Sequence, residues 1–245
     1  MSAAAVIEPL GDQAFSLRLG TPGDAAAAPR VQAVAARLLD QAATATWPPG
    51  VTDVVPGYAS VLVVYDALVA DPDRVRAWIS AAVHAATATA TTAAGADPPA
   101  PGAQPRTVEL PILYMSEVAP DLEPLAREKG MGVDQLVMLH TAPLYRCALV
   151  GFRPGFPFLT GLDPRLAAAR LATPRTRVPA GSVGIGGLQT GVYPVESPGG
   201  WRIIGRTPVR LFDLQRPDPF LVHAGDFVRF VAIDADRFAA LDRAR

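Results

Sequence analysis

The chain has 245 residues, of which 50% are hydrophobic and 18% charged, with 22 basic against 23 acidic side chains. This near-neutral balance argues against nucleic acid or an anionic membrane surface as a partner, and no run of about 18 apolar residues is present to cross a bilayer. Cys147 is the only cysteine and the start lacks the basic and apolar segments of a signal peptide, so we expect a cytoplasmic protein without an internal disulfide.

Residues 1–87 are expected to form a small α/β domain. Alternating or β-branched apolar residues indicate strands, and apolar residues at helical spacing indicate helices that pack on them. The order β-α-β-β-α suggests an α+β, ferredoxin-like unit with its helices on one face of a small sheet. The predicted elements are strands at 14–19, 51–55 and 60–65, and helices at 30–43 and from Asp71 onward.

Residues 88–106 are expected to form a linker between two domains. The segment is rich in Ala, Thr, Pro and Gly, and it offers almost nothing to pack. A helix can run through its first alanines, but it cannot continue through Asp97-Pro98-Pro99.

Residues 107–238 are expected to form a mainly-β domain, followed by a charged tail at 239–245. Glycine and proline recur every few residues from Gly151 to Gly205, which suits short strands joined by tight turns better than helices. Many short strands with turns between them imply a closed or nearly closed barrel. The other predicted elements are strands at 107–113, 145–150 and 227–233, and helices at 121–129 and 133–140.

Arginines are concentrated in the same glycine-rich stretch. Between Tyr145 and Arg210 there are nine, against two acidic residues, Asp163 and Glu196. Planar guanidinium groups beside glycine-rich turns suit a carboxylate or a phosphate, so we predict a cationic, glycine-lined hollow that receives an anionic small molecule. Lys129 is the only lysine and lies in REKGMG, which excludes a P-loop. The nine arginines are Arg146, Arg153, Arg165, Arg170, Arg175, Arg177, Arg202, Arg206 and Arg210.

Several long motifs carry a resemblance to a known family. The second half of the chain contains HTAPLYRCALVGFRPGFPFLTGLDPRL, TPRTRVPAGSVGIGGLQTGVYPVESPGGWRIIGRTPVRLFD and AGDFVRF, and the first half contains IEPLGDQAFSLRL and VVPGYASVLVVYD. Together they closely resemble the family variously called allophanate hydrolase subunit 1, KipI, or the B subunit of the bacterial ATP-dependent 5-oxoprolinase. The resemblance covers nearly the whole chain except the linker.

The resemblance implies a fold, partners and a reaction. Members of this family have a small α/β domain followed by a cyclophilin-like β-barrel. They act with a KipA-like partner (the C subunit) and a LamB/YcsF-like protein (the A subunit). The complex opens 5-oxo-L-proline to L-glutamate at the expense of ATP, with Mg²⁺ held in the complex. The expected cofactor is therefore ATP, and the expected substrate is a small molecule.

Other functions stay open beside this one. A member of the same family binds a sensor histidine kinase and inhibits it, so a non-catalytic regulator is the alternative function. Peptidyl-prolyl isomerase activity is suggested by the barrel analogy alone, and a fold does not by itself carry a function.

Catalytic roles are predicted for His140, Arg175 and Arg177. The His140 imidazole suits a general acid or base or a substrate hydrogen bond; the alternative is a residue at a helix C-terminus bonded to backbone carbonyls. Arg175 and Arg177 flank one residue of a strand, so they are expected to point to the same side and clamp a carboxylate or phosphate. Alternatively, they are solvated or pair with a partner protein.

Binding roles are predicted for ten further residues of this stretch. Its aromatic rings either flank a flat ligand or belong to the core, and Gly155 either lets the backbone approach a ligand or makes a turn. Ser182 is expected to form a hydrogen bond rather than act as a nucleophile, because its surroundings are not G-x-S-x-G. The residues are Tyr145, Phe152, Pro154, Gly155, Phe156, Ser182, Gln189, Thr190, Glu196 and Arg206.

Phosphate and metal binding are considered at the same residues. Backbone amides of 179–187, with Gln189 and Thr190, are candidates to hold an oxyanion or phosphate. Glu196 either binds magnesium or pairs with an arginine such as Arg206. No Cys or His spacing typical of a metal site occurs, so no metal ligand is predicted, and Cys147 is expected to be an inert buried thiol.

Overall fold

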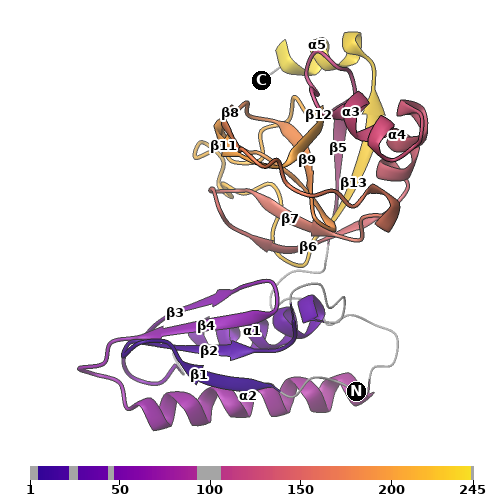
Figure 1. The fold of residues 1–245 in the computed structure, drawn as a ribbon. Helices are drawn as coiled ribbons and strands as arrows, with labels where there is room; N and C mark the ends of the chain where they lie inside the picture. The colour runs from indigo at the N-terminus through magenta and orange to yellow at the C-terminus, as the bar shows by residue number, and fades with distance from the viewer. Residues whose placement is uncertain (1–4, 22–26, 44–46, 93–105, 244–245) are drawn as a thin grey trace. The chain divides into compact units, whose positions relative to one another are not determined.

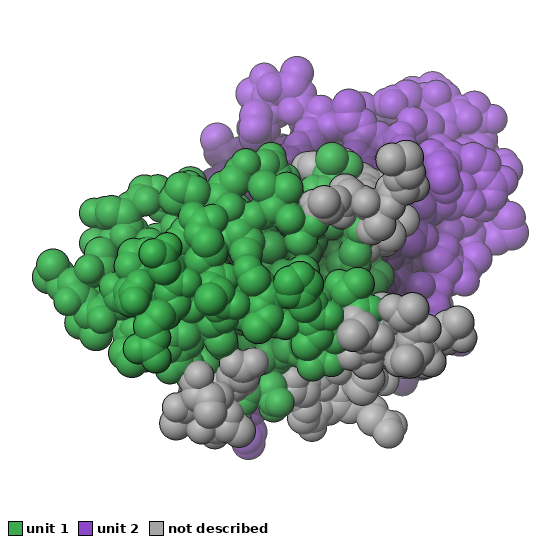
Figure 2. Space-filling model, turned by 90° about the horizontal axis from the view of Figure 1, so that it is seen from below, with its two compact units in different colours: residues 1–105 green, residues 106–245 purple. Residues whose placement is uncertain are grey.

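The computed structural model describes residues 5–21, 27–43, 47–92 and 106–243. The chain divides into two compact units, residues 1–105 and residues 106–245, which are coloured separately in Figure 2. Each unit has its own core and is described by itself.

In the described part of the chain, the first unit is a four-stranded sheet with two helices (Figure 1). The strand order is β1-β2-β4-β3, and every neighbouring pair is antiparallel. The strands are β1 (Val6–Pro9), β2 (Ala14–Arg18), β3 (Val51–Pro56) and β4 (Ser60–Tyr65), and the helices are α1 (Ala27–Ala43) and α2 (Pro72–Thr92).

One face of this sheet is buried against the helices. On β4, Val61, Val63 and Tyr65 are buried while the residues between them are half-buried, which is the alternation that a sheet covered on one face produces. Val31 and Leu38 of α1 belong to the same cluster. Burial of apolar area, at about 25 cal/mol per Å², is the main source of stability in such a unit.

The first unit differs from the sequence-based prediction in two places. Strand β1 is absent from the prediction; it precedes β2 in the chain, pairs with it and forms an outer strand of the sheet. The ferredoxin-like assignment therefore stays a prediction. Helix α2 extends to Thr92, so the linker predicted at 88–106 begins with helix. Residues 93–105, with the predicted helix stop at Asp97-Pro98-Pro99, lie outside the described residues.

The second unit contains a closed barrel, built among the described residues from seven strands (Figure 1). The strand order around it is β10-β7-β6-β13-β5-β12-β9, and the pairs are antiparallel except for the parallel pair of β13 with β5. The expected closed barrel is confirmed, and its cyclophilin-like character stays a prediction. The strands are β5 (Thr107–Leu113), β6 (Tyr145–Val150), β7 (Pro157–Thr160), β9 (Ser182–Gly186), β10 (Gln189–Val192), β12 (Arg202–Arg206) and β13 (Phe227–Ile233).

Shorter elements accompany the barrel. A separate two-stranded sheet pairs β8 (Arg175–Val178) with β11 (Ser197–Gly199). The helices are α3 (Leu122–Glu128), α4 (Val133–Thr141), the 3-10 turn η1 (Pro164–Leu166) and α5 (Ala235–Arg243). Because α5 runs through Arg243, the described part of the predicted charged tail is helical. None of the described helices combines the length and the hydropathy that crossing a membrane requires.

Two apolar clusters hold the second unit together. The larger fills the barrel with strand residues such as Leu110 and Ile112 and with Leu125 and Leu136 of the flanking helices. The smaller is mainly aromatic and consists of Phe156, Val178, Tyr193, Trp201 and Ile203, with Phe158 packed against it.

The glycine-rich run of β9 is explained by Trp201. A Cβ on Gly186 would lie 2.6 Å from two atoms of the Trp201 indole, and a Cβ on Gly184 would lie 3.1 Å from its Cβ. Glycine lets the strand pass directly under the ring. The amides of β9 pair with β10 and β12, so this strand does not present the free amides expected of a phosphate-binding loop at 179–187.

Candidate functional site

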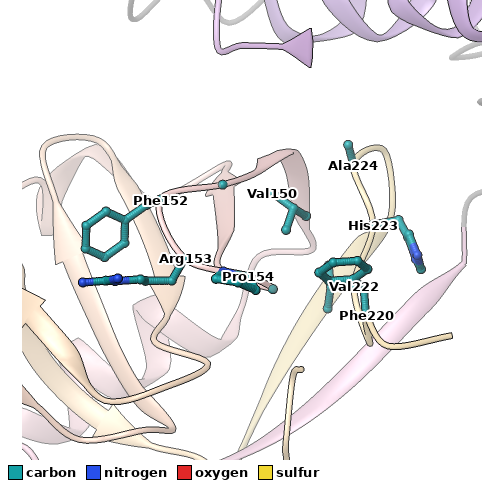
Figure 3. A pocket seen from close by; sticks show the side chains of 10 residues that line it. Val150, Phe152, Arg153, Pro154, Phe220, Val222, His223 and Ala224 are labelled. Atoms are coloured by element: carbon teal, nitrogen blue, oxygen red, sulfur yellow. The ribbon is translucent and has the colours of Figure 1, made fainter. Parts of the chain in front are cut away.

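The second unit contains a pocket of about 510 Å³ between two segments of chain (Figure 3). One wall is formed by residues 150–155, where β6 ends, and the other by residues 220–224, shortly before β13. A volume of this size is typical of sites for small molecules. This pocket is therefore the candidate functional site.

Tight backbone turns shape the first wall. The Gly151 N–H donates to the Phe156 carbonyl and the Phe156 N–H donates to the Arg153 carbonyl, both at 3.0 Å. Gly155 has φ +81°, and a Cβ there would lie 2.9 Å from the Phe212 Cβ. Only glycine fits this position, so Gly155 makes the turn and lines the pocket as well.

Phe152 and Arg153 lie together at one end of this wall (Figure 3). Phe152 has φ +65° and is the only non-glycine with a positive φ among the described residues. The left-handed region costs a residue with a side chain of order 1–2 kcal/mol, and 59% of Phe152 is exposed. The Arg153 guanidinium carbon lies 5.6 Å from the centre of the ring, within reach of a cation–π contact.

His223 in the second wall is held by charged neighbours. Arg106 donates from Nη2 to His223 Nδ1 at 2.6 Å and from Nε to Asp226 Oδ2 at 3.0 Å. Because a guanidinium only donates, Nδ1 carries no proton. The proton is then on Nε2, which faces Asp218 Oδ1 at 3.3 Å. Both ring nitrogens of His223 thus have partners, and its ring forms part of the pocket wall.

Part of this site is predictable from the sequence. Phe152, Pro154 and Gly155 are among the predicted binding residues, and all three line the pocket. His223 is not among them. One feature of the sequence could have indicated it: His223 stands three residues before Asp226, just ahead of the strand predicted at 227–233. Functional side chains often gather on loops of this kind.

His140 lies inside the barrel rather than at the pocket. It is fully buried. The Tyr114 hydroxyl donates to Nδ1 at 2.8 Å, and Nε2–H donates to Thr190 Oγ1 at 2.9 Å. The Thr190 hydroxyl in turn donates to the Gly184 carbonyl at 3.0 Å, which assigns the imidazole proton to Nε2. The ring of Phe230 stacks on His140 at 4.7 Å.

Burial keeps His140 uncharged. Removal of the imidazolium from water lowers its pKa from 6.5 to about 3. The Tyr145 hydroxyl donates to the His140 carbonyl at 2.7 Å and is buried in the same core. A general acid or base must reach the proton that it moves, so this geometry does not support the roles of His140, Tyr145 and Thr190, which stay predictions.

Arg175 forms an ion pair with a buried acid and is not one arm of a ligand clamp. Its two terminal nitrogens donate to the two carboxylate oxygens of Asp121 at 2.8 and 2.9 Å. The Asp121 side chain is 7% exposed and also accepts the Ile203 N–H at 2.7 Å. Asp121 directly precedes α3 and lies outside the stretch 145–210, in which acidic residues are scarce. A count of acids within that stretch therefore misses this partner.

Arg177 points to a different partner. Its Nε lies 2.7 Å from Glu196 Oε2, and both side chains are largely exposed. The predicted clamp shared by Arg175 and Arg177 is therefore not formed. Glu196 does pair with an arginine, but the suggested partner Arg206 is wrong, since Arg206 donates to the Ala180 carbonyl at 3.2 Å.

The remaining predicted residues do not line the pocket. Phe156 is buried, with ring centres 5.1 Å from Tyr193 and 5.4 Å from Trp201, which supports its interpretation as core. Ser182 is buried, and in the described part of the chain its hydroxyl has no hydrogen-bond partner. Gln189 is half-buried at the start of β10.

The nine arginines of the glycine-rich stretch do not gather at the pocket. Arg153 is the only one of them that lines the pocket. Four others pair with carboxylates, so the predicted hollow with several cationic groups is not formed at this pocket. The four pairs are Arg165–Asp163, Arg175–Asp121, Arg177–Glu196 and Arg202–Glu128.

Within the described part of the chain, neither a metal-binding cluster nor an exposed cysteine is present. Among the described residues, no group of three or more His, Cys, Asp or Glu side chains is arranged to hold a metal ion. Cys147 is buried, and burial raises the pKa of its thiol, in line with the interpretation as an inert residue.

Comparisons with known proteins agree on one family. Residues 5–222 match the protein family described as the carboxyltransferase domain, subdomain C and D. The chain is 37% identical to the B subunit of 5-oxoprolinase from Escherichia coli O157:H7, over 91% of this chain and 93% of that protein. It is 48% identical to the Bacillus subtilis protein of the same name, over 55% of this chain and 56% of that protein, and thus spans about half of that relative. The crystal structure of TTHA0988 matches with a TM-score of 0.74 at 34% identity, over 91% of this chain and 41% of that chain.

Proposed function

Because the chain belongs to the family of the carboxyltransferase domain, subdomain C and D, together with proteins named as the B subunit of 5-oxoprolinase, we propose that it is the B subunit of an ATP-dependent 5-oxoprolinase. The observation that carries the proposal is the match to the Escherichia coli protein, which extends over nearly the full length of both chains. The reaction opens 5-oxo-L-proline to L-glutamate and hydrolyses ATP.

The reaction needs activation because amide resonance makes a five-membered lactam resistant to water. In the proposed sequence, the ring carbonyl oxygen takes the terminal phosphoryl group of ATP and ADP leaves. Water then adds to the same carbon, the C–N bond breaks and the nitrogen takes a proton. A second water releases phosphate and leaves L-glutamate. A component of this enzyme has to orient the ring and exclude competing water.

The pocket of this chain fits a small ligand better than it fits ATP. Its lining contains a single arginine, Arg153, whereas a triphosphate is usually held by several cations or by free backbone amides. The amides of β9 are engaged in the barrel. We therefore assign ATP, with its Mg²⁺, mainly to the partner proteins, and the lactam to this chain.

The proposed partners are a KipA-like protein, as the C subunit, and a LamB/YcsF-like protein, as the A subunit. The match to TTHA0988 supports a partner protein. This chain covers 41% of that longer chain, so the rest of TTHA0988 has room for a segment equivalent to a partner. The lone cysteine agrees with a complex that works in the reducing cytoplasm.

Reconstitution tests this function. The chain is co-expressed with its KipA-like and LamB/YcsF-like partners, and ADP and L-glutamate are measured with and without 5-oxo-L-proline. We expect both products to form in equal amounts, only with the lactam and only when this chain is present. A complex that assembles but shows no lactam-dependent ATP hydrolysis, while the chain inhibits a sensor histidine kinase, would establish the regulatory alternative instead.

A further inference from the structure

We propose that an outer surface of the second unit, formed by Phe152, Arg153 and Arg170, docks an acidic segment of a partner protein. Carboxylates of that segment pair with the two guanidinium groups, and an apolar side chain covers the Phe152 ring. The inference rests on the proposed function for the identity of the partner, the KipA-like protein, and adds the place and the chemistry of the contact. We call these three residues the arginine–aromatic surface.

The aromatic cluster of the second unit lies on the outer side of the barrel. On β7, Leu159 belongs to the large cluster that fills the barrel, whereas its neighbour Phe158 packs against the aromatic cluster. On β12, Ile204 and Ile203 divide between the two clusters in the same way. Successive side chains of a strand point to opposite faces, so the aromatic cluster covers the outside of this part of the barrel wall.

Phe152 extends this cluster to the surface. Its ring meets those of Phe156 and Tyr193 edge-on, at centroid distances of 5.5 and 6.4 Å, and 59% of the residue is exposed. Figure 3 shows the side chains of Phe152 and Arg153 directed away from Val222, which lies across the pocket. The ring is therefore anchored by its neighbours and open to solvent on the side that faces away from the pocket.

Each arginine of the surface lies over one aromatic ring. The guanidinium carbon of Arg153 is 5.6 Å from the centre of the Phe152 ring, and that of Arg170 is 6.0 Å from the Trp201 ring. Ring contacts from Phe152 through Phe156 to Trp201, at 5.5 and 5.4 Å, connect the two positions. Stacking restricts the orientation of a guanidinium but leaves its N–H groups available, and a planar guanidinium can hold a carboxylate through two parallel hydrogen bonds.

The positive charge of this surface has no acidic partner in the described part of the chain. Neither Arg153 nor Arg170 forms an ion pair there. By contrast, Arg175, Arg177 and Arg202 of the same stretch each pair with a carboxylate. Arginine and aromatic side chains are enriched at protein interfaces and among the residues that contribute most to binding. Charge complementarity therefore indicates an acidic partner.

The backbone of Phe152 provides an independent indication. Its φ of +65° lies in the left-handed region, which costs a residue with a side chain of order 1–2 kcal/mol. Glycine would make the same turn without this cost, and a ring that is mostly exposed adds little to the core. Strain of this kind persists where the surrounding structure enforces it, and it gathers at functional sites. The strained residue thus points to a contact that the exposed ring makes with another molecule.

Two other occupants fit the arginine–aromatic surface less well. A second copy of this chain docked about a twofold axis would bring the same arginines of both copies together, and like charges repel. A nucleic acid strand is held by contacts to many phosphates, whereas this surface offers two arginines on a chain of net charge −1. An acidic protein segment needs only a few carboxylates and also uses the aromatic ring.

The test measures the affinity of the full chain for the purified KipA-like partner by titration calorimetry, at about 0.05 and about 0.5 M NaCl. In the double variant Arg153→Glu/Arg170→Glu, we expect a Kd about 10- to 100-fold higher at low salt and a loss of most of the salt dependence. The neutral double variant Arg153→Gln/Arg170→Gln should show a smaller rise. Phe152→Gly, which removes the ring and leaves the charges, should raise the Kd about 5- to 10-fold.

Arg229→Glu is the matched control. Arg229 is exposed on β13, which is not among the strands that carry the aromatic cluster, and it forms no ion pair in the described part of the chain. The control variant changes the net charge by the same amount per residue and should keep the wild-type Kd. Thermal denaturation of each variant checks that it is folded.

Lactam-dependent ATP hydrolysis by the reconstituted complex separates this inference from the proposed function. If the double variant binds the partner weakly and the wild-type complex hydrolyses no ATP with the lactam, the surface is supported and the function is overturned. If the complex is active and the folded arginine variants bind as tightly as Arg229→Glu, the function is supported and the surface is overturned. A wild-type chain that does not bind the KipA-like partner would also overturn the surface.

Discussion

Arg175 and Asp121 are 54 residues apart in the sequence and form a two-point ion pair at 2.8 and 2.9 Å. Asp121 is also tied to Ile203 through both its side chain and its backbone N–H, at 2.7 and 3.0 Å. One nearly buried carboxylate thereby connects the start of α3, β8 and β12. The arginine that the sequence pattern favours for ligand binding therefore holds the second unit together.

Removal of Asp121 is expected to destabilise the protein strongly. In Asp121→Ala, the Arg175 guanidinium and the Ile203 N–H lose their acceptor, and removing one partner of a buried pair costs about 3 kcal/mol or more. Equilibrium urea unfolding measures the loss. The control is Glu196→Ala, which breaks the exposed pair with Arg177 and should cost less than about 1 kcal/mol. Equal losses in the two variants would contradict the structural role assigned to Asp121.

His140 is expected to make the protein less stable in acid. Its pKa is about 3 in the folded chain and 6.5 in the unfolded chain, so the unfolded chain binds the proton first as the pH falls. The contribution of neutral His140 is complete above pH 6.5 and is lost progressively from there toward pH 3. The slope from this one group is at most about 1.4 kcal/mol per pH unit.

The His140→Gln variant isolates this contribution. Carboxylates also titrate in acid, so the quantity to compare is the difference in free energy of unfolding between wild type and variant at pH 7, 6, 5 and 4. We expect this difference to shrink as the pH falls. A constant difference would show that His140 does not titrate with a lowered pKa. The same variant can be assayed in the reconstituted complex. A large loss of kcat in a His140→Gln variant whose free energy of unfolding is close to that of the wild type would instead favour the predicted proton transfer.

Local patterns in the sequence predict the elements of the structure well. Period-two alternation in β2 and β4 and helical spacing in α1 each reflect one buried face, which neighbouring residues report directly. The short strand β1 has no such pattern, because most of its residues are exposed. Its position depends on pairing with β2, which is a tertiary contact.

The site is harder to predict because its residues are defined by partners far away in the chain. Arg175 and Arg153 look alike in sequence, and only the fold shows that Asp121 neutralises the first and that no acid in the described part of the chain pairs with the second. Glycines of β9 look like a phosphate loop, but the reason for Gly186 is the distant Trp201. Composition thus points to the stretch that contributes residues 150–155 to the pocket, without separating the residues that line it from those that hold the fold.

Gly186 is expected to tolerate no side chain. In Gly186→Ala the new Cβ would lie 2.6 Å from the Trp201 ring, and overpacking of this kind typically costs about 1–3 kcal/mol. Gly200→Ala is the matched control, since its nearest neighbour would be Pro174 at an ordinary 3.7 Å. Urea unfolding followed by tryptophan fluorescence reports both stability and the environment of Trp201. A Gly186→Ala variant as stable as Gly200→Ala would contradict the packing explanation.

Phe152 is expected to contribute little to the stability of the fold. Phe152→Gly removes the left-handed strain, of order 1–2 kcal/mol, but gives up an edge contact to Phe156 at a 5.5 Å centroid distance and adds freedom to the unfolded chain. These contributions nearly cancel, so the free energy of unfolding should change by less than about 1 kcal/mol. Phe156→Ala, which empties a buried site in the aromatic cluster, should instead lose about 3–5 kcal/mol. If Phe152→Gly unfolded as easily as Phe156→Ala, the exposed ring would be part of the core, and its strained backbone would serve packing.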